Sequence, residues 1–230
     1  MYLSESHVYT ILHGMISDIS NITLFVYAFT SIFAIVNPLS GVMAFVSLTS
    51  KMSAADKIYV AKRSVVIACI IAVIFSITGE YLLSALFNIT VDHLRVAGGI
   101  LLFLVAMDML FARMTRESIT SEELSDAAQR EDVSIFPMAL PILTGPGAIT
   151  TTILVTKAGG DDPFARVIII AAILLIFVIT YVIFLFSDTV NRVVGLTGMM
   201  VMTRLMGLFL GAIAVDFVAQ GIKGIYISLV

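Results

Sequence analysis

Charged residues are scarce in this chain, and their scarcity sets the first limits on what it can be. Of 230 residues, 13% are charged and 60% are hydrophobic, whereas a soluble domain carries about 25% charged residues. The single cysteine, Cys69, lies in an apolar run and excludes an intramolecular disulfide. Tryptophan is absent, so tyrosine and phenylalanine must supply any interfacial aromatic side chains. The excess of apolar side chains requires lipid as its solvent.

Several functional classes lack the residues that they need. The net charge of -3 argues against a nucleic-acid partner. No HExxH motif, nucleophile elbow or Walker A loop occurs, so a zinc membrane protease, a serine membrane protease and an ATP-driven pump have no support. The histidines, His7, His13 and His93, lie outside the apolar centres. The sequence therefore predicts no enzyme, no bound metal and no cofactor.

Long apolar runs are what the sequence has instead. A membrane-spanning helix needs about 20 mostly apolar residues, and six runs qualify: 22–49, 60–87, 94–112, 135–155, 165–186 and 199–222. Residues 1–20 lack the basic start and unbroken apolar core of a signal peptide. We therefore expect an N-terminal interfacial segment at 1–20, three spans within 21–112, a polar linker over 113–132 and three further spans within 133–230.

The two halves share three features in the same order. The matching positions are Pro38 with Pro146, Arg95 and Gly98 with Arg204 and Gly207, and, offset by one residue, Asp108 with Asp216. Because each half has three spans, the second half must enter from the opposite side of the membrane. The sequence therefore predicts an all-α membrane protein of six transmembrane helices, arranged as two inverted three-helix repeats.

Lysine and arginine in the loops indicate the orientation. With the N-terminus outside, the inner side receives Lys51, Lys57, Lys62, Arg63, Arg113, Arg116, Arg130, Arg192 and Arg204, and the outer side receives Arg95, Lys157, Arg166 and Lys223. The excess on the inner side predicts a multi-pass protein of the cell (inner) membrane with both termini extracytoplasmic and the polar linker cytoplasmic.

Prolines within the first and fourth spans predict two helices broken near the midplane. Proline removes a backbone donor from a helix and glycine adds freedom to unwind. The freed peptide groups must meet protein or a water-filled cavity. One such break is explained as well by a structural kink, but paired breaks in inverted halves indicate a substrate site. We predict that site from seven residues: Asn37, Pro38, Ser40, Thr144, Gly145, Pro146 and Gly147.

The ends of broken helices suit a small zwitterionic amino acid. An amino-terminal helix end offers free N–H groups and a partial positive charge for a carboxylate. A carboxy-terminal end offers carbonyls for an ammonium group or a cation. The Asn37 amide and the hydroxyls of Ser40 and Thr144 add further donors and acceptors, although many such hydroxyls bond only their own helix.

Two aspartates inside apolar runs, Asp108 and Asp216, are candidates for coupling to H⁺ or Na⁺, because ionisable residues within spans are costly and often functional. A structural partner for each carboxylate is the alternative. An aspartyl protease needs two carboxylates that share a proton. Here the two are expected to differ in depth by roughly 15 Å at about 1.5 Å per residue, which argues against that activity.

Four segments resemble signatures of the MarC family. FAIVNPLSGVMAFVSLTS at 33–50 is similar to its first-helix signature and PILTGPGAITT at 141–151 to its fourth-helix signature; LRVAGGIL at 94–101 and RLMGL at 204–208 also fit. The family includes a transporter of small neutral amino acids, so the resemblance implies a six-span secondary transporter of that class. Of the seven predicted site residues, all except Ser40 match the family's motifs, so the resemblance implies a role in the site for those six. Ser40-Gly41 departs from the pattern, since many members carry a glycine nearer the proline.

We therefore expect alternating-access transport of glycine, alanine or serine, coupled to protons or another ion. A passive channel or facilitator that uses the same breaks as a filter remains an alternative, as does a non-transport membrane assembly protein. The lipid bilayer surrounds the protein in each case. Gly207-x-x-x-Gly211 is a small-residue packing pattern, which leaves open whether it serves a homo-oligomer or contact between helices of one chain.

Overall fold

The computed structural model describes residues 5–87, 89–111, 132–160 and 162–229, and within these ranges all regular structure is helical, with no strand. The segments are α1 (Glu5–Val36), α2 (Pro38–Leu48), α3 (Ala54–Phe87), α4 (Val91–Leu110), η1 (Ser134–Leu143), α6 (Pro146–Ala158), α7 (Pro163–Leu185) and α8 (Ser187–Leu229). In this part of the chain five helical stretches are long and apolar enough to cross a membrane, and η1 with α6 forms a bent pair that counts as a sixth. The protein is thus an all-helical, multi-pass membrane protein.

Polar residues at the ends of the bundle start two of the long helices. The Asp162 side chain accepts a hydrogen bond from the Phe164 amide, and Pro163 occupies the first position of α7. At the start of α3, the Ser53 hydroxyl accepts from the Asp56 amide at 3.2 Å and donates to the Asp56 carboxylate at 2.7 Å. The cap of α7 lies close to the start of the apolar run 165–186, whereas the cap of α3 starts that helix before the apolar run 60–87 begins.

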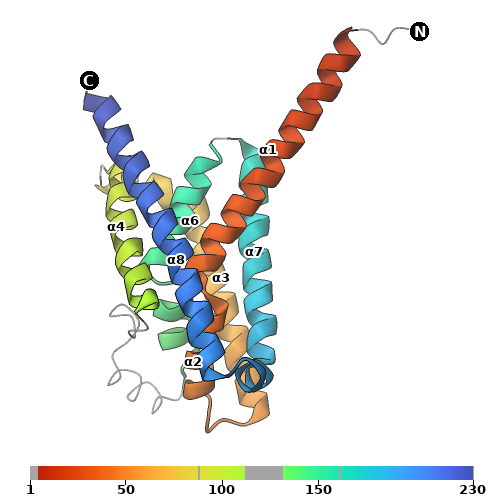
Figure 1. The fold of residues 1–230 in the computed structure, drawn as a ribbon, viewed down its shortest axis with the longest axis vertical. Helices are drawn as coiled ribbons and strands as arrows, with labels where there is room; N and C mark the ends of the chain where they lie inside the picture. The colour runs from red at the N-terminus through yellow and green to blue at the C-terminus, as the bar shows by residue number, and fades with distance from the viewer. Residues whose placement is uncertain (1–4, 88, 112–131, 161, 230) are drawn as a thin grey trace.

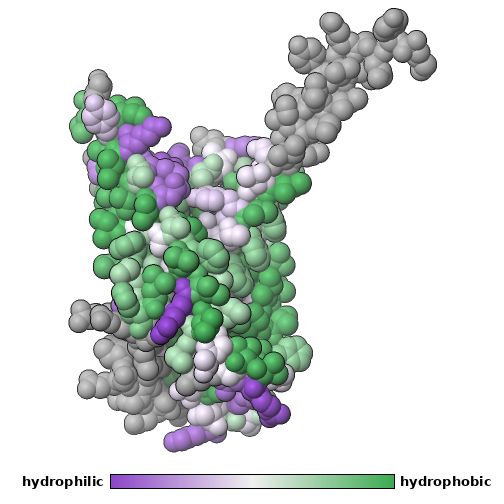
Figure 2. Space-filling model, in the orientation of Figure 1, coloured by the Kyte–Doolittle hydropathy of each residue, from purple (hydrophilic) through white to green (hydrophobic). Residues whose placement is uncertain are grey.

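The chain crosses the bundle in alternating directions and returns to the side on which it began. Figure 1 shows both termini at one end of the molecule, which we call the terminal end. The opposite end contains the α2–α3 connection and the α7–α8 connection, and we call it the basic end because 51–63 includes Lys51, Lys57, Lys62 and Arg63. Figure 2 shows apolar side chains over most of the visible face, with hydrophilic ones gathered toward both ends and one hydrophilic strip in the middle.

The helices of the two halves are interleaved rather than separate. The helices α1 and α3 pack against α7, α3 also packs against η1 and α6, and the most extensive contact joins α4 to α8. The first span of each half therefore contacts the second span of the other half. The third spans, α4 and α8, pair with each other along their length.

Two glycines allow α4 and α8 to approach closely. A Cβ atom placed on Gly99 would lie 2.8 Å from the carbonyl oxygen of Ala214 and 3.0 Å from the peptide nitrogen four residues further on. A Cβ on Gly207 would lie 3.0 Å from the carbonyl oxygen of Ala106 and 3.2 Å from the nitrogen four residues beyond it. Residue numbers fall along α8 as they rise along α4, so the two helices are antiparallel.

The observed helices differ from the expected spans at two places. Helix α1 begins at Glu5, so residues 5–20 continue the first span as one helix. Gly195, with φ 65° and ψ 170°, interrupts α8, and the membrane-crossing part starts at Thr197. In Figure 1 the short piece before this kink is seen nearly end-on at the basic end. The predicted linker 113–132 lies outside the described residues except for Asp132.

Candidate functional site

The first interruption is a single residue in a left-handed conformation. Asn37 has φ 42° and ψ 68°, between the end of α1 and Pro38, which is the first residue of α2. Asparagine tolerates this conformation because its short side chain bonds locally. Its Oδ1 accepts a hydrogen bond from the Ser40 amide at 3.3 Å, and its Nδ2 donates to the Ser40 hydroxyl at 2.6 Å. With Asn37 only 6% exposed, the amino-terminal end of α2 is buried and capped by its own chain.

A chain of hydroxyls connects this interruption to α8. The Ser40 hydroxyl lies 2.7 Å from the Thr203 hydroxyl, which donates to the Met199 carbonyl at 2.9 Å. The predicted residues Asn37 and Ser40 are thus brought together, and Thr203 joins them. Sequence reasoning missed Thr203, because a hydroxyl in an apolar helix usually bonds only its own backbone.

The second interruption is longer and less regular than a single kink. The backbone of η1 is extended at Phe136 and Leu140, and hydrogen bonds join residues five apart, from Met138 to Val133 and from Thr144 to Ala139. Helix α6 then starts at Pro146, and its axis is bent by 54° from that of η1. The sequence indicated a break at 145–147 but gave no account of the irregular segment before it.

The amino-terminal end of α6 has no side-chain cap. Gly145 is the N-cap residue with an extended backbone, and the hydroxyl of the preceding Thr144 donates instead to the Ala68 carbonyl of α3, at 3.2 Å. Pro146 has no N–H group, so Gly147 offers one of the first amides of this helix. Pro146 is exposed and Gly145 half-buried. This end of α6 is therefore open in the sense that no side chain caps it, although Gly147 and Ala148 are buried, whereas the start of α2 is capped by Asn37.

The two interruptions meet inside the bundle. A Cβ atom on Gly147 would lie 3.1 Å from the side chain of Ile35, two residues before Asn37, and one on Gly41 would lie 3.8 Å from the side chain of Leu143. From this meeting point α2 runs toward the basic end and α6 toward the terminal end (Figure 1). Both amino-terminal ends, each with a partial positive charge, thus point into the same region.

Two buried hydroxyls beside the meeting point make no hydrogen bond within the described part of the chain. They belong to Ser31, which is 1% exposed, and Thr151, which is 0% exposed. Ser31 precedes Ile35 by four residues and Thr151 follows Gly147 by four, so in antiparallel helices they lie one turn away at the same level. Buried polar atoms are nearly always satisfied, and the neighbouring Thr152 hydroxyl bonds the Ala148 carbonyl.

The aspartates lie apart on the α4–α8 pair. Asp108 is half-buried on α4, and Asp216 is exposed on α8, where it accepts a hydrogen bond from Gln220 at 2.7 Å. Asp108 is close to the level of Gly207, and Asp216 is nine residues further along α8, or roughly 13 Å. Across the described residues no three His, Cys, Asp or Glu side chains gather closely enough to hold a metal ion.

Ion pairs join the two halves at both ends of the bundle. Near the terminal end, Lys157 of α6 pairs with Glu80 of α3 at 2.5 Å, and near the basic end Lys57 of α3 pairs with Asp188 of α8 at 3.0 Å. Glu80 and Asp188 are 108 residues apart, as Pro38 and Pro146 are. None of these pairs was predicted, since partners on different helices cannot be matched from sequence alone.

A third pair fixes the start of η1. Arg63 lies 2.5 Å from the carboxylate of Asp132, which also accepts hydrogen bonds from the amide and the hydroxyl of Ser134. The hydrogen bond from the Ser134 hydroxyl is the largest of the effects that lower the pKa of Asp132 below its usual range, and Arg63 adds to it. The charged carboxylate thus holds the entry to the fourth span against α3.

Comparison with known proteins identifies the family. The profile of the MarC family integral membrane proteins matches residues 22–226. The chain belongs to the MarC family. Among its relatives is a UPF0056 membrane protein of Methanocaldococcus jannaschii, 38% identical over 200 residues, which are 87% of this chain and 96% of the relative. Others are YvbG of Bacillus subtilis, 34% identical over 204 residues (87% and 95%), and YhcE of Escherichia coli, 33% identical over 215 residues (94% and 99%).

These MarC relatives carry names that describe membrane proteins and state no activity. No solved structure matches the chain. The resemblance at the two proline-containing segments is thus confirmed at the level of the family, across both interruptions described above.

Proposed function

We propose that this MarC-family protein is a secondary transporter of small neutral amino acids that works by alternating access. The observation that carries the proposal is the meeting of two amino-terminal helix ends inside the bundle, one capped by Asn37 and the other open at Gly145. An open helix end of this kind binds a carboxylate through its free amides and its partial positive charge. We place the carboxylate of the substrate at the start of α6, near Gly147 and Ala148.

The other end of a zwitterion needs oxygen atoms that can accept hydrogen bonds. Pro38 has no N–H, so the buried carbonyl of Ala34 lacks the donor that a continuous helix would give it. The unpartnered hydroxyls of Ser31 and Thr151 lie one turn away. We propose that the ammonium group of the substrate is bound on this side of the site.

Close packing around the open helix end favours a small substrate. A Cβ atom on Gly145 would lie 2.7 Å from the carbonyl oxygen of Pro141, and one on Gly147 would lie 3.1 Å from the side chain of Ile35. Distances below about 3.0 Å leave no room for even a methyl group without movement of the surroundings. Glycine, alanine and serine are therefore the amino acids that we propose as substrates.

The architecture that we propose is two inverted three-helix repeats with broken first and fourth helices near the midplane. The reciprocal contacts of Gly99 and Gly207 support it, because a two-fold rotation exchanges α4 with α8 and each contact with the other. These contacts relate Gly99, rather than Gly98, to Gly207. The shift of 108 residues is also the one that relates Pro38 to Pro146 and Asp108 to Asp216.

We further propose the cell inner membrane as the location, with both termini extracytoplasmic. The support is the lysine and arginine content of the basic end, since positively charged loops stay in the cytoplasm. Asp108 and Asp216 remain our candidates for coupling to H⁺ or Na⁺. If either couples transport to protons, its replacement by asparagine should abolish uptake driven by a pH gradient and leave exchange of bound amino acid in place.

Uptake of labelled glycine into proteoliposomes tests the proposal, with and without a pH or Na⁺ gradient. We expect saturable, concentrative uptake by the natural protein and loss of uptake for Gly145→Leu and Asn37→Ala. Gly211→Ala is the matched control, because its new Cβ would lie 3.6 Å from Ala106, an ordinary contact. Flux that never saturates would instead indicate a channel, and absence of both flux and glycine binding in a folded protein would indicate an assembly role.

A further inference from the structure

A groove of about 300 Å³ lies between α3 and α7, and no residue of the two interruptions lines it. Its lining residues are Lys62, Val65, Val66, Cys69, Leu174, Phe177, Val178 and Tyr181. Val65 and Phe177 are buried at its floor, while Val66, Leu174 and Val178 are about half exposed along its rim. The groove is thus open along the outer surface of two membrane-spanning helices.

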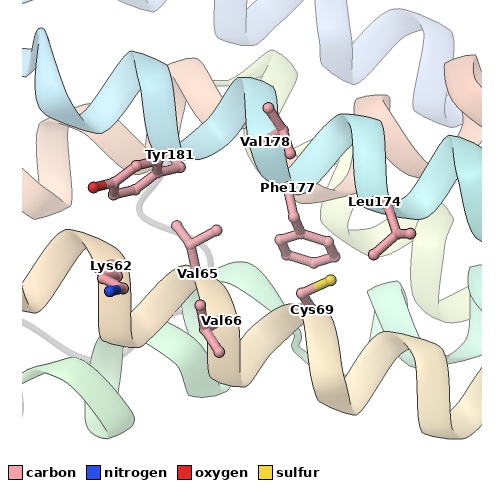
Figure 3. A pocket seen from close by; sticks show the side chains of 8 residues that line it. All are labelled: Lys62, Val65, Val66, Cys69, Leu174, Phe177, Val178 and Tyr181. Atoms are coloured by element: carbon pink, nitrogen blue, oxygen red, sulfur yellow. The ribbon is translucent and has the colours of Figure 1, made fainter.

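The polar groups of this groove are confined to one end. Figure 3 shows the ammonium group of Lys62 and the hydroxyl of Tyr181 at the same end, with Cys69 and Leu174 toward the other. Among the described residues, no carboxylate pairs with Lys62, although Lys57, Lys157, Arg63 and Arg95 each have one. One end of the groove therefore offers a positive charge and a hydroxyl, and the rest of its length is apolar.

The polarity of the groove follows the depth of the membrane. Tyr181 is four residues before the end of α7 and Lys62 is eight residues after the start of α3, or about 6 and 12 Å along helices of 1.5 Å rise per residue. Leu174 lies about 17 Å from the end of α7 on the same scale. Half of a hydrocarbon core is about 15 Å thick. The polar end of the groove is therefore the end nearer the helix termini at the basic end, from which the long Lys62 side chain can extend toward the headgroups, and the apolar end lies at about the depth of the bilayer centre.

We propose that this groove binds one phospholipid of the leaflet at the basic end. Its phosphate would contact the Lys62 ammonium and the Tyr181 hydroxyl, and one acyl chain would lie over Val65, Cys69 and Phe177. A basic residue near the surface attracts anionic lipid, and no described carboxylate neutralises Lys62. Anionic phosphatidylglycerol should therefore bind better than zwitterionic phosphatidylcholine.

A phospholipid fits these features better than other occupants. A helix of a second protein would fill the apolar length but would need an acidic side chain placed opposite Lys62, whereas every anionic phospholipid carries its charge at the head of its apolar chains. A small amino acid would leave most of the apolar length empty. The groove is also formed by α3 and α7 alone, so lipid binding there does not depend on the proposed transport site.

Native mass spectrometry of the purified full chain tests the proposal, after equilibration with phosphatidylglycerol or phosphatidylcholine. We expect one retained phosphatidylglycerol per chain and lower occupancy of phosphatidylcholine. Lys62→Gln should lower phosphatidylglycerol occupancy by about fivefold, the equivalent of roughly 1 kcal/mol per basic residue. Tyr181→Phe should lower it less, because it removes a hydroxyl and no charge. Lys51→Gln, an exposed lysine outside the groove, is the matched control and should change nothing.

A second measurement locates the acyl chain. Phosphatidylglycerol with a photoreactive group in one chain should crosslink to the segments 65–69 and 174–178, and Val178→Trp should abolish this crosslinking by filling the groove. Val178 is 58% exposed, so the larger side chain leaves the fold intact, as thermal unfolding in detergent would verify. Equal retention of the two lipids, unchanged in Lys62→Gln, would indicate non-specific annular lipid and overturn the proposal. Retention of a second copy of the protein in place of lipid would also overturn it.

Discussion

Gly99 of α4 and Gly207 of α8 make the same contact in opposite directions, each facing a carbonyl oxygen on the helix of the other. The contact requires both residues to lack a side chain, because the two backbones approach as closely as small residues allow in membrane helices. It also fixes the pairing of the two third spans, on which the proposed two-fold relationship between the halves depends.

Replacement of either glycine by alanine should loosen this pair. Gly207→Ala would place a methyl group 2.8 Å from the Cβ atom of Met109, and overpacking of this kind costs about 1–3 kcal/mol. We expect a clear fall in the thermal unfolding temperature in detergent for Gly99→Ala and Gly207→Ala. Gly211→Ala on the same helix has room and should unfold like the natural protein. Equal unfolding temperatures for Gly207→Ala and Gly211→Ala would contradict the close approach.

The left-handed conformation of Asn37 predicts an order of stability among its variants. Asn37→Gly keeps the backbone conformation and loses the cap, which costs a few tenths of a kcal/mol. Asn37→Ala loses the cap and also loses the local side-chain hydrogen bonds that let asparagine adopt the left-handed conformation, which disfavours other residues with a Cβ atom by about 1–2 kcal/mol. Thermal unfolding should therefore rank the natural protein first, Asn37→Gly second and Asn37→Ala last. An Asn37→Ala protein as stable as Asn37→Gly would show that the conformation carries no cost.

The ion pairs at opposite ends predict opposite changes in access to the site. In an alternating-access cycle, we expect the Lys157–Glu80 pair to hold the terminal end closed and the Lys57–Asp188 pair to hold the basic end closed. Ile149 is half-buried in the first turn of α6, where its amide bonds the Gly145 carbonyl. Glu80→Gln should raise labelling of Ile149→Cys, in a Cys69→Ser background, by an impermeant maleimide added at the terminal end. Asp188→Asn should raise labelling from the basic end. Exposed pairs contribute up to about 1 kcal/mol, so changes up to about fivefold are expected.

The charge-swapped variant Glu80→Lys with Lys157→Glu is the control for this measurement. It restores an ion pair at the same place and should restore the labelling of the parent. If Glu80→Gln and Asp188→Asn changed labelling from the same side, the two pairs would not close opposite ends, whatever the substrate.

Asp132 predicts a loss of stability in acid. Its pKa is lowered in the folded protein, first by the Ser134 hydroxyl and also by Arg63. The stabilisation is therefore present above the unfolded value of about 3.9 and is lost as the pH falls through the lower folded value. Asp132→Asn should lose less thermal stability than the natural protein between pH 7 and pH 3, and Ser134→Ala should lie between them. If the unfolding temperature fell with pH in the same way for all three proteins, Asp132 would not be the group whose protonation destabilises the fold.

Much of the fold could be predicted from the sequence, because a helix that crosses a lipid bilayer must be long and apolar. Runs of about 20 apolar residues mark the spans, and Pro38 and Pro146 mark the points where α2 and α6 begin. The irregular course of η1 was not predicted, although Pro137 and Pro141 lie within it. Proline shows that a regular helix cannot continue, but neighbouring helices decide what conformation replaces it.

Only part of the candidate site could be predicted from the sequence, for a related reason. Local patterns identified Asn37 and Gly145, whose roles depend on their own backbone. They gave no sign that Thr144 would bond Ala68 instead of capping α6, nor that Thr203 would reach Ser40. Those contacts join residues far apart in the sequence, and helix packing alone brings them together.

The opposed directions of α2 and α6 have a consequence for an unoccupied carrier. Two positive dipole ends then point into the same region and repel, while a bound carboxylate screens that repulsion. Reorientation of the loaded protein should therefore meet a lower barrier than return of the vacant one. Counterflow of labelled for unlabelled glycine would then outpace net accumulation, a kinetic trait traceable to the geometry at Asn37 and Gly145.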